Sequence, residues 1–211
     1  MAKGILIAAM NIGNAAEDEF HDWYDTEHLP ERQRVPGFLA CQRWIGADDR
    51  KISVATYDLE AAGVLQGAEY RAIGGENLSP WSKRLTAKVD RLLRFEGEQT
   101  LPGDANAPSG AGGLLLVGMT PAPDTEAAFN AWYDREHVPA LASVPGVLCA
   151  RRFRGSASGT KYVALYHLEA PGVVDSAEWK RASASTPMPG HVRETITDRV
   201  RIVCRNYVRA A

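Results

Sequence analysis

The sequence predicts an α+β protein of two βαββαβ units whose antiparallel sheets pack face to face. The first observation is a duplication, since FHDWYDTEHLP at 20–30 returns as FNAWYDREHVP at 129–139. The second is that each copy lies in the same order of predicted strands and helices. The third is that helices on one face of an antiparallel sheet leave the other face to be buried. The sheet of the other half is the simplest cover for it.

The duplication extends over most of the chain. His28 and His137 lie 109 residues apart, as do most other matched positions. Near the end of each half, AspArg pairs begin at Asp90 and Asp198, 108 residues apart, which indicates a one-residue deletion in the second half. Solenoid repeats are shorter and need three or more copies, so two copies of a domain-sized unit are indicated.

Length, composition and charge are those of a packed globular protein. The chain has 211 residues, 45% of them apolar, a net charge of −2 and a pI near 6.2. Its Lys and Arg residues are scattered, which argues against nucleic acid or an anionic membrane as a partner. The apolar stretch 4–10 is too short to span a membrane and lacks a signal-peptide cleavage site.

The three cysteines, Cys41, Cys149 and Cys204, form no CxxC pair. An odd number without such spacing predicts neither a disulfide framework nor a zinc site, and the cytoplasm is the expected location. We interpret Cys41 and Cys149 as small buried hydrophobes.

Apolar patterning and turn residues place the elements of the first half. A helix-period pattern starts near Glu17, and the helix is expected to end near Pro30, because proline interrupts helical hydrogen bonding. Alternating apolar residues on either side of a polar loop predict a hairpin. In order, we expect strand 5–10, helix 17–30, strands 38–45 and 52–59, helical segments from Ala68 and from Trp81, and a last strand at 92–95.

The second half repeats this order, and a linker joins the two. Gly, Pro, Ala and Ser dominate the stretch between the halves, which indicates a flexible surface tether. The predicted units are residues 1–98 and 113–211, with residues 99–112 as the linker. Within the second unit we expect strand 114–119, helix 126–139, hairpin 147–168, a helix near Ala177 and a last strand at 200–204.

The first helix carries two ionisable side chains on its aromatic face. Phe20, Trp23, Tyr24, Glu27 and His28 follow the i, i+3, i+4, i+7, i+8 spacing of one buried stripe. A carboxylate and an imidazole in such a place are costly unless paired, and burial shifts their pKa values toward acid or base function. Neighbours on a helix cannot easily pair with each other. Each therefore needs a partner from the sheet or from a ligand.

The second copy repeats the pair as Glu136 and His137. A structural interpretation competes with the catalytic one, because imidazolium is favourable near the negative end of a helix and the proline that follows stops the helix anyway. Asp25 and Asp134 lie off the stripe, and we expect them to be solvated or to anchor a turn.

The hairpin strands supply further pocket candidates. Arg43 and Arg152 each precede an aromatic residue, so guanidinium and ring point to opposite faces of the sheet. An inward arginine suits a carboxylated substrate, but pairing with a cross-strand acid at the surface is the favoured interpretation. Tyr57 and Tyr166 either reach the site or satisfy a core donor. The predicted substrate-binding residues are Tyr24, Arg43, Tyr57, Trp81, Tyr133, Arg152 and Tyr166.

The two halves differ next to the repeated motif. The first continues with GluArgGlnArg at 31–34, where the second has AlaLeuAlaSer at 140–143, and Asp58 corresponds to His167. One pocket is therefore expected to be the more polar, and we favour the first half as the working site.

The motif F-x-x-W-Y-D-x-E-H-x-P, followed by ValProGly and a strand ending in ArgTrp or ArgPhe, resembles the dimeric α/β-barrel superfamily, closest to its EthD-like branch. The resemblance implies two ferredoxin-like units that pack as a pseudo-dimeric α/β barrel, with helices outside and a pocket in each unit. Members include cofactor-free monooxygenases, isomerases, polyketide cyclases, haem-degrading oxygenases and chlorite dismutases. Several cofactor-free members use a pocket histidine as acid or base, which implies that role for His28 and His137. The haem-binding branches use a different motif, so no cofactor is expected.

The leading hypothesis is a cofactor-independent lyase, isomerase or cyclase of small-molecule catabolism, acting on an aromatic-derived or carboxylated compound. In it, His28 moves a proton and Glu27 orients the imidazole or the substrate. A cofactor-free monooxygenase of phenolic substrates and a non-catalytic small-molecule-binding protein are the alternatives. Because the barrel keeps the two motif helices apart, no metal site is expected. Association of the fused units into a homo-oligomer is left open.

Overall fold

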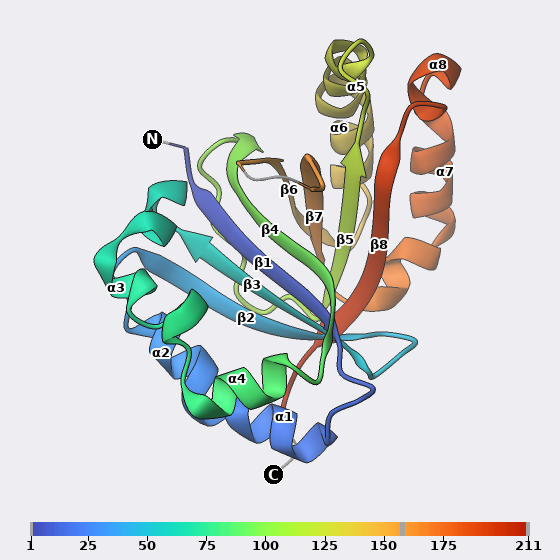
Figure 1. Cartoon of the computed structure of the whole chain (residues 1–211). Coiled ribbons are helices and arrows are strands. Elements are labelled where there is room, and N and C mark those ends of the chain that lie inside the picture. The colour runs from blue at the N-terminus through green and yellow to red at the C-terminus, as the bar shows by residue number, and fades with distance from the viewer. Residues whose placement is uncertain (1, 157–158, 210–211) are drawn as a thin grey trace.

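Eight strands among the described residues close into one antiparallel barrel (Figure 1). The computed structural model describes residues 2–156 and 159–209. Residues 157 and 158 of the expected second hairpin, and the outer ends of both expected units, lie outside these ranges. The strands are β1 (Gly4–Asn11), β2 (Phe38–Gly46), β3 (Ile52–Leu59), β4 (Asp90–Leu101), β5 (Gly113–Thr120), β6 (Val147–Gly155), β7 (Tyr162–Leu168) and β8 (Thr197–Asn206).

The strand order around the barrel is β1-β3-β2-β8-β5-β7-β6-β4. Each half supplies four neighbouring strands, and the two sheets join at both edges through the β2–β8 and β4–β6 pairs. The expected stack of two separate sheets is therefore corrected to one closed sheet, which leaves no unpaired edge strand. The inner faces of both halves do share a core, where Ile5 and Ile7 pack with Leu114 and Leu116.

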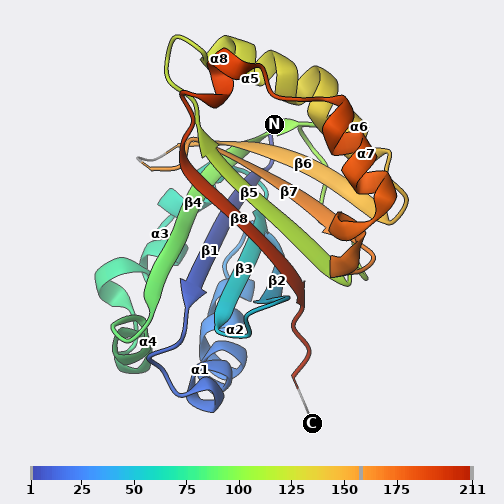
Figure 2. The same cartoon turned by 90° about the vertical axis from the view of Figure 1, so that its right-hand side faces the viewer.

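Short helices cover the outside of the barrel, and Figure 2 shows those of the two halves on separate sides. Among residues 2–156 and 159–209, no helix has both the length and the apolar character that crossing a membrane requires. The helices are α1 (Glu17–Trp23), α2 (Leu29–Gln33), α3 (Ala68–Arg71), α4 (Pro80–Thr86), α5 (Glu126–Trp132), α6 (Val138–Ala142), α7 (Ala177–Ser185) and α8 (Gly190–Arg193).

The motif helix continues past its proline in both halves. A π-helical turn at Tyr24–His28 connects α1 to α2, and a matching turn at Tyr133–His137 connects α5 to α6. Pro30 follows this turn within the first two residues of α2, where the N–H that proline lacks is little missed. The predicted helix end near Pro30 is wrong for this reason. The π turn also sets the histidine at its last position, and such turns are frequent at functional sites.

The register of β4 and β8 corrects the alignment of the two halves. Arg94 pairs with Ala8, and Arg201 pairs with Val117, the residue 109 positions after Ala8. Arg94 and Arg201, which are 107 residues apart, are therefore equivalent, and the AspArg pairs that suggested an offset of 108 are not. Both last strands are longer than predicted. β4 takes up the first three residues of the expected linker.

Side chains of the barrel hold the segment that follows β4. The amide oxygen of Gln99 accepts from the backbone N–H groups of Gly103 and Ala105 at 3.1 and 2.9 Å. The carboxylate of Asp58 accepts from the N–H of Ala107 at 2.6 Å. These contacts order a segment whose composition suggested a flexible tether, because buried backbone groups need partners.

Candidate active site

A cavity of about 480 Å³ lies between the outer face of the first-half sheet and the helices that cover it. Its floor is apolar, formed by Leu6, Ala8 and Met10, whose side chains point away from the barrel interior because strand residues alternate. Tyr70 and Leu78 close it on the side of the second helical segment. The volume lies in the range of small-molecule sites.

His28 is the buried titratable group of this cavity. Its ring centroid lies 4.4 Å from that of Trp23 and 4.9 Å from that of Tyr24. Nδ1 is buried and has no hydrogen-bond partner among the described residues. Burial, then the positive charges of Arg32 and Arg43, hold the pKa of His28 well below its usual value. The imidazole is therefore neutral at pH 7 and able to accept a proton from a bound molecule.

Three guanidinium groups line the same cavity, those of Arg32, Arg91 and Arg94. Arg32 is buried and lies 2.8 Å from the carboxylate of Glu31, and Arg94 pairs with Glu96. Neither carboxylate lines the cavity, whose described lining residues include no Asp or Glu. The cavity therefore combines an apolar floor with a positive electrostatic potential, which favours anions over cations.

Glu27 points away from His28 and toward α4. Its Oε1 accepts hydrogen bonds from the hydroxyl of Ser79 and, at 3.2 Å, from that of Ser82. Ser79 is the N-cap of α4 and accepts from the Ser82 N–H at 2.9 Å. The side chain that the sequence placed beside the imidazole thus fastens α4 to the motif helix. Its counterpart Glu136 is exposed to solvent.

Of the predicted aromatic contacts in the first half, Tyr57 lines the cavity. Its hydroxyl lies 2.6 Å from that of Tyr24, which is buried behind it. Burial raises the pKa of both hydroxyls, so both stay protonated at neutral pH. Trp81 packs against the same core from α4.

Arg43 and Arg152 are buried, which corrects the favoured interpretation of surface arginines. Arg43 pairs with Asp25 and stacks over the ring of Tyr24, with 4.2 Å between its Cζ and the ring centroid. Arg152 pairs with Asp134 at 2.6 Å. The two acids expected to be solvated or to anchor turns are therefore the partners of these arginines. Each pair ties a barrel strand to the motif helix, at a place outside both histidine cavities.

The matching cavity of the second half is smaller, about 170 Å³. Nδ1 of His137 lies 3.0 Å from the Thr186 hydroxyl, and burial lowers the pKa of His137 to about 4. Leu141 lines this cavity at the position where the first half has Arg32. The other predicted residues that line it are Tyr133 and Tyr166. The first cavity is the larger and the more cationic of the two.

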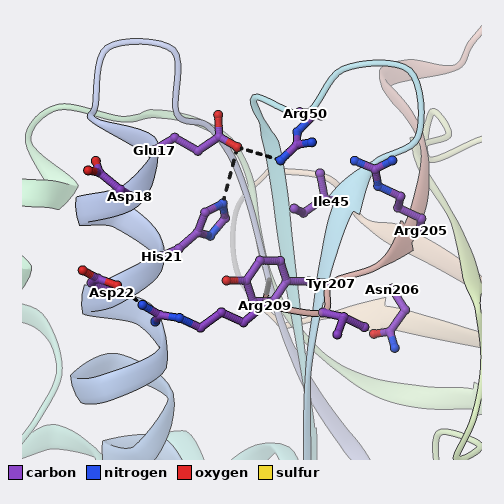
Figure 3. A pocket seen from close by; sticks show the side chains of 11 residues that line it. Glu17, Asp18, His21, Asp22, Ile45, Arg50, Arg205, Asn206, Tyr207 and Arg209 are labelled. Carbon is purple, nitrogen blue, oxygen red and sulfur yellow. Dashed lines mark hydrogen bonds and ion pairs between the residues drawn. The ribbon is translucent and has the colours of Figure 1, made fainter. Parts of the chain in front are cut away.

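A wider surface hollow of about 720 Å³ lies between α1 and the C-terminal segment 205–209 (Figure 3). Its charged groups neutralise one another across the hollow, as Figure 3 shows for Glu17 with Arg50 and for Asp22 with Arg209. These pairs fasten the C-terminal segment to α1. The hollow is larger than the His28 cavity but presents no comparable set of converging unpaired groups among the described residues.

The structure thus brings His28 and Tyr57 together but adds residues that the sequence did not single out. The signal for Arg32 was present in the GluArgGlnArg stretch, which indicated a more polar first pocket. For Arg94 the signal was concealed, because the offset of 108 hid its match to Arg201. Strand register, which the sequence alone did not reveal, was needed to find it.

The closed barrel, with a cavity between sheet and helices in each half, defines a protein of the dimeric α/β-barrel fold, as predicted. Neither the protein-family models nor the curated proteins contain a match to the chain. Solved structures match it over almost its whole length. A "Putative Chlorite dismutase" is 12% identical with a TM-score of 0.65, covering 99% of this chain and 96% of its own. An "anthrone oxidase-like protein" is 12% identical with a TM-score of 0.63, covering 97% and 92%.

A third solved structure is a "Putative monooxygenase" from Fusobacterium nucleatum, 10% identical with a TM-score of 0.60. The match covers 97% of this chain and 92% of that one. At these identities the likeness establishes the fold, and function has to be argued from the site.

Proposed function

We propose that this chain is a cytoplasmic small-molecule enzyme that works without a bound cofactor and uses His28 as a general base. The observation that carries the proposal is the neutral, buried imidazole that lines the 480 Å³ cavity. In this proposal the chain is a fused pseudo-dimer of ferredoxin-like units of the EthD-like type. Residues 1–98 and 113–211 form the two units, and the first holds the working site.

The proposed first step is a proton transfer. An acidic C–H or phenolic O–H bond of the substrate breaks, the proton goes to Nε2 of His28, and the electron pair stays on the substrate. The guanidinium groups of Arg32, Arg91 and Arg94 stabilise the resulting anion, since preorganised positive charge acts most strongly where water is excluded. Return of the proton to another atom of the substrate gives an isomerase, and loss of a leaving group gives a lyase.

A cofactor-free monooxygenase of phenolic substrates is the second candidate. It shares the first step, and the likeness to the oxidase-like and monooxygenase structures supports it. The substrate anion then supplies the electrons that reduce dioxygen. One oxygen atom enters the substrate and the other leaves as water, so the reaction balances without an external reductant.

Proton exchange tests the shared step. The purified protein is incubated in D₂O with a panel of phenols and ring carboxylates, and deuterium uptake and product formation are followed by mass spectrometry. We expect His28→Gln to lower the exchange rate by about 10²–10⁴-fold, the usual contribution of a general base. His137→Gln is the matched control and is expected to retain the rate.

The same experiment separates the candidates. Turnover that stops under argon selects the monooxygenase, and turnover that continues selects the lyase or isomerase. Binding without exchange or turnover across the panel selects the non-catalytic binding protein and contradicts the proposal. A visible Soret band in the purified protein contradicts the cofactor-free part of it.

A further inference from the structure

The charges around the first cavity are unbalanced. Arg32 and Arg94 have carboxylate partners in Glu31 and Glu96, whereas Arg91 forms no ion pair with the described residues. Three guanidinium groups and two carboxylates leave one positive charge over. His28 does not change this balance, because it is neutral at pH 7. A ligand with one negative charge would complete the site.

The arginines and the histidine lie at different depths. Arg91 and Arg94 are exposed on β4, and they pair in register with Met10 and Ala8 of the cavity floor. The ring of His28 is packed against aromatic side chains, and its Nδ1 is buried. An anionic group therefore meets arginine at the outer side of the cavity, whereas a group deeper inside meets the imidazole.

The space between them is apolar. Ala8, Met10 and Leu93 line the floor, and Tyr57 and Tyr70 stand beside it. Flat apolar surfaces of this kind pack well against an aromatic ring. The cavity is thus suited to an amphipathic molecule, with its charge at one end and its reacting atom at the other.

We propose that the substrate of the first site is an aromatic-ring carboxylate, with its carboxylate held by Arg91 and Arg94 and its ring over the β1–β4 floor. The inference rests on the proposed function, because it places the reacting atom beside His28. Arginine suits a carboxylate because its planar fork donates two parallel hydrogen bonds. The anion site thus lies on β4, and not at Arg43, whose guanidinium is already occupied by Asp25.

The second half provides a matched control. Arg201 stands at the position of Arg94 and also lines a cavity, but that cavity measures about 170 Å³ and has Leu141 in place of Arg32. A substitution at Arg201 removes the same charge from the same strand position without touching the proposed site.

The test is calorimetric titration of the full chain with 4-hydroxybenzoate and with its uncharged analogue 4-hydroxybenzamide. We expect the acid to bind at least about tenfold more tightly than the amide, and Arg91→Gln and Arg94→Gln each to weaken acid binding by about tenfold, as for one charged hydrogen bond. Amide binding is expected to stay unchanged in both variants. Arg201→Gln is expected to bind like the parent protein, and thermal unfolding checks that each variant is folded.

Equal affinity for acid and amide would overturn the inference, and so would an acid preference that survives both β4 substitutions. Failure of a panel of single-ring acids to bind at millimolar concentration would contradict it as well. His28→Gln separates this inference from the proposed function. It is expected to keep the acid preference, so loss of exchange in that variant concerns catalysis alone, whereas loss of the preference in the β4 variants concerns binding alone.

Discussion

Asp58 of β3 and Arg151 of β6 form an ion pair inside the barrel, with 2.8 Å between Oδ2 and Nη1. Their side chains are only 4% and 1% exposed, so the pair is removed from water. The same carboxylate oxygen accepts the N–H of Ala107. One buried charge pair therefore joins the first half, the second half and the segment between them.

Removal of one partner of this pair is expected to destabilise the whole chain. Arg151→Met leaves the Asp58 carboxylate buried without its counter-charge, and breaking a buried pair in this way costs about 3–5 kcal/mol. Replacing both, as in Asp58→Leu with Arg151→Met, removes the unpaired charge and is expected to cost less. Urea unfolding measures both. A double variant less stable than Arg151→Met would contradict this view of the pair.

Acid is expected to destabilise the protein through His167, which faces the same interior. This residue is fully buried, and burial, then the charge of Arg151, lowers its pKa to about 3. The unfolded chain, with a histidine pKa near 6.5, binds a proton below that pH that the folded chain does not bind. Stability from this group is thus complete above about pH 6.5 and falls by roughly 1.4 kcal/mol per pH unit as the pH drops toward 3.

Substituting His167 tests this linkage. His167→Leu is expected to flatten the dependence of the unfolding free energy on pH between 6.5 and 4, by about one proton per molecule. Urea titrations at several pH values give the slope. His191→Gln, on the exposed surface, is the control. An unchanged slope in His167→Leu would show that this histidine is already protonated in the folded chain.

Sequence patterns were informative where they report local periodicity. The aromatic stripe that includes Phe20 and Trp23 is buried as the helical spacing predicted, and the repeat located the second copy of the fold. The first half also holds the more polar cavity, as the contrast between the two copies indicated. These features depend on neighbours along one element, which a sequence displays directly.

Features that depend on pairing between elements were missed. Asp25 lies off the helix stripe, and only the fold reveals that Arg43 of β2 reaches it. Glu27 lies on the stripe, yet its partner Ser79 is 52 residues away, and nothing local announces that contact. The helix that passes Pro30 depends on a π turn, for which hydrophobic spacing carries no signal. Long-range geometry decided each of these cases.

Glu27 is expected to contribute to stability and not to proton transfer. It accepts from Ser79 and Ser82 at the start of α4, so Glu27→Gln weakens hydrogen bonds to a charged acceptor and is expected to lower the unfolding free energy by about 1–2 kcal/mol. Glu136→Gln, at the exposed counterpart, is expected to change it by less than about 0.5 kcal/mol. Urea unfolding gives both values. A Glu27→Gln variant of parental stability that has lost proton exchange would restore the catalytic role.

Tyr207 is expected to hold the C-terminal segment on the first half. Its ring stacks on His21 with 4.7 Å between centroids, and Arg43 lies 4.0 Å from its centroid. Tyr207→Ala is expected to lower the unfolding free energy by about 1–2 kcal/mol, through lost stacking and cation–π contact. Val208→Ala is the control, because Val208 is 78% exposed. Equal unfolding midpoints for the two variants would contradict the fastening role.

The pH dependence of turnover is expected to report on His28. As a base it must be neutral, and its pKa lies well below the usual value, so kcat/KM is expected to stay constant as the pH falls through 6.5 and to decline only at lower pH. Arg32→Leu introduces the residue found at the matching position of the second half and removes the larger of the two charge effects on that pKa. The acid limb is expected to move to higher pH but to remain below 6.5, because burial is the largest cause of the shift. Arg34→Leu, on the exposed side of the same segment, controls for loss of charge. An acid limb that stays fixed in Arg32→Leu, with the variant shown to be folded, would mean that a group other than His28 carries the proton.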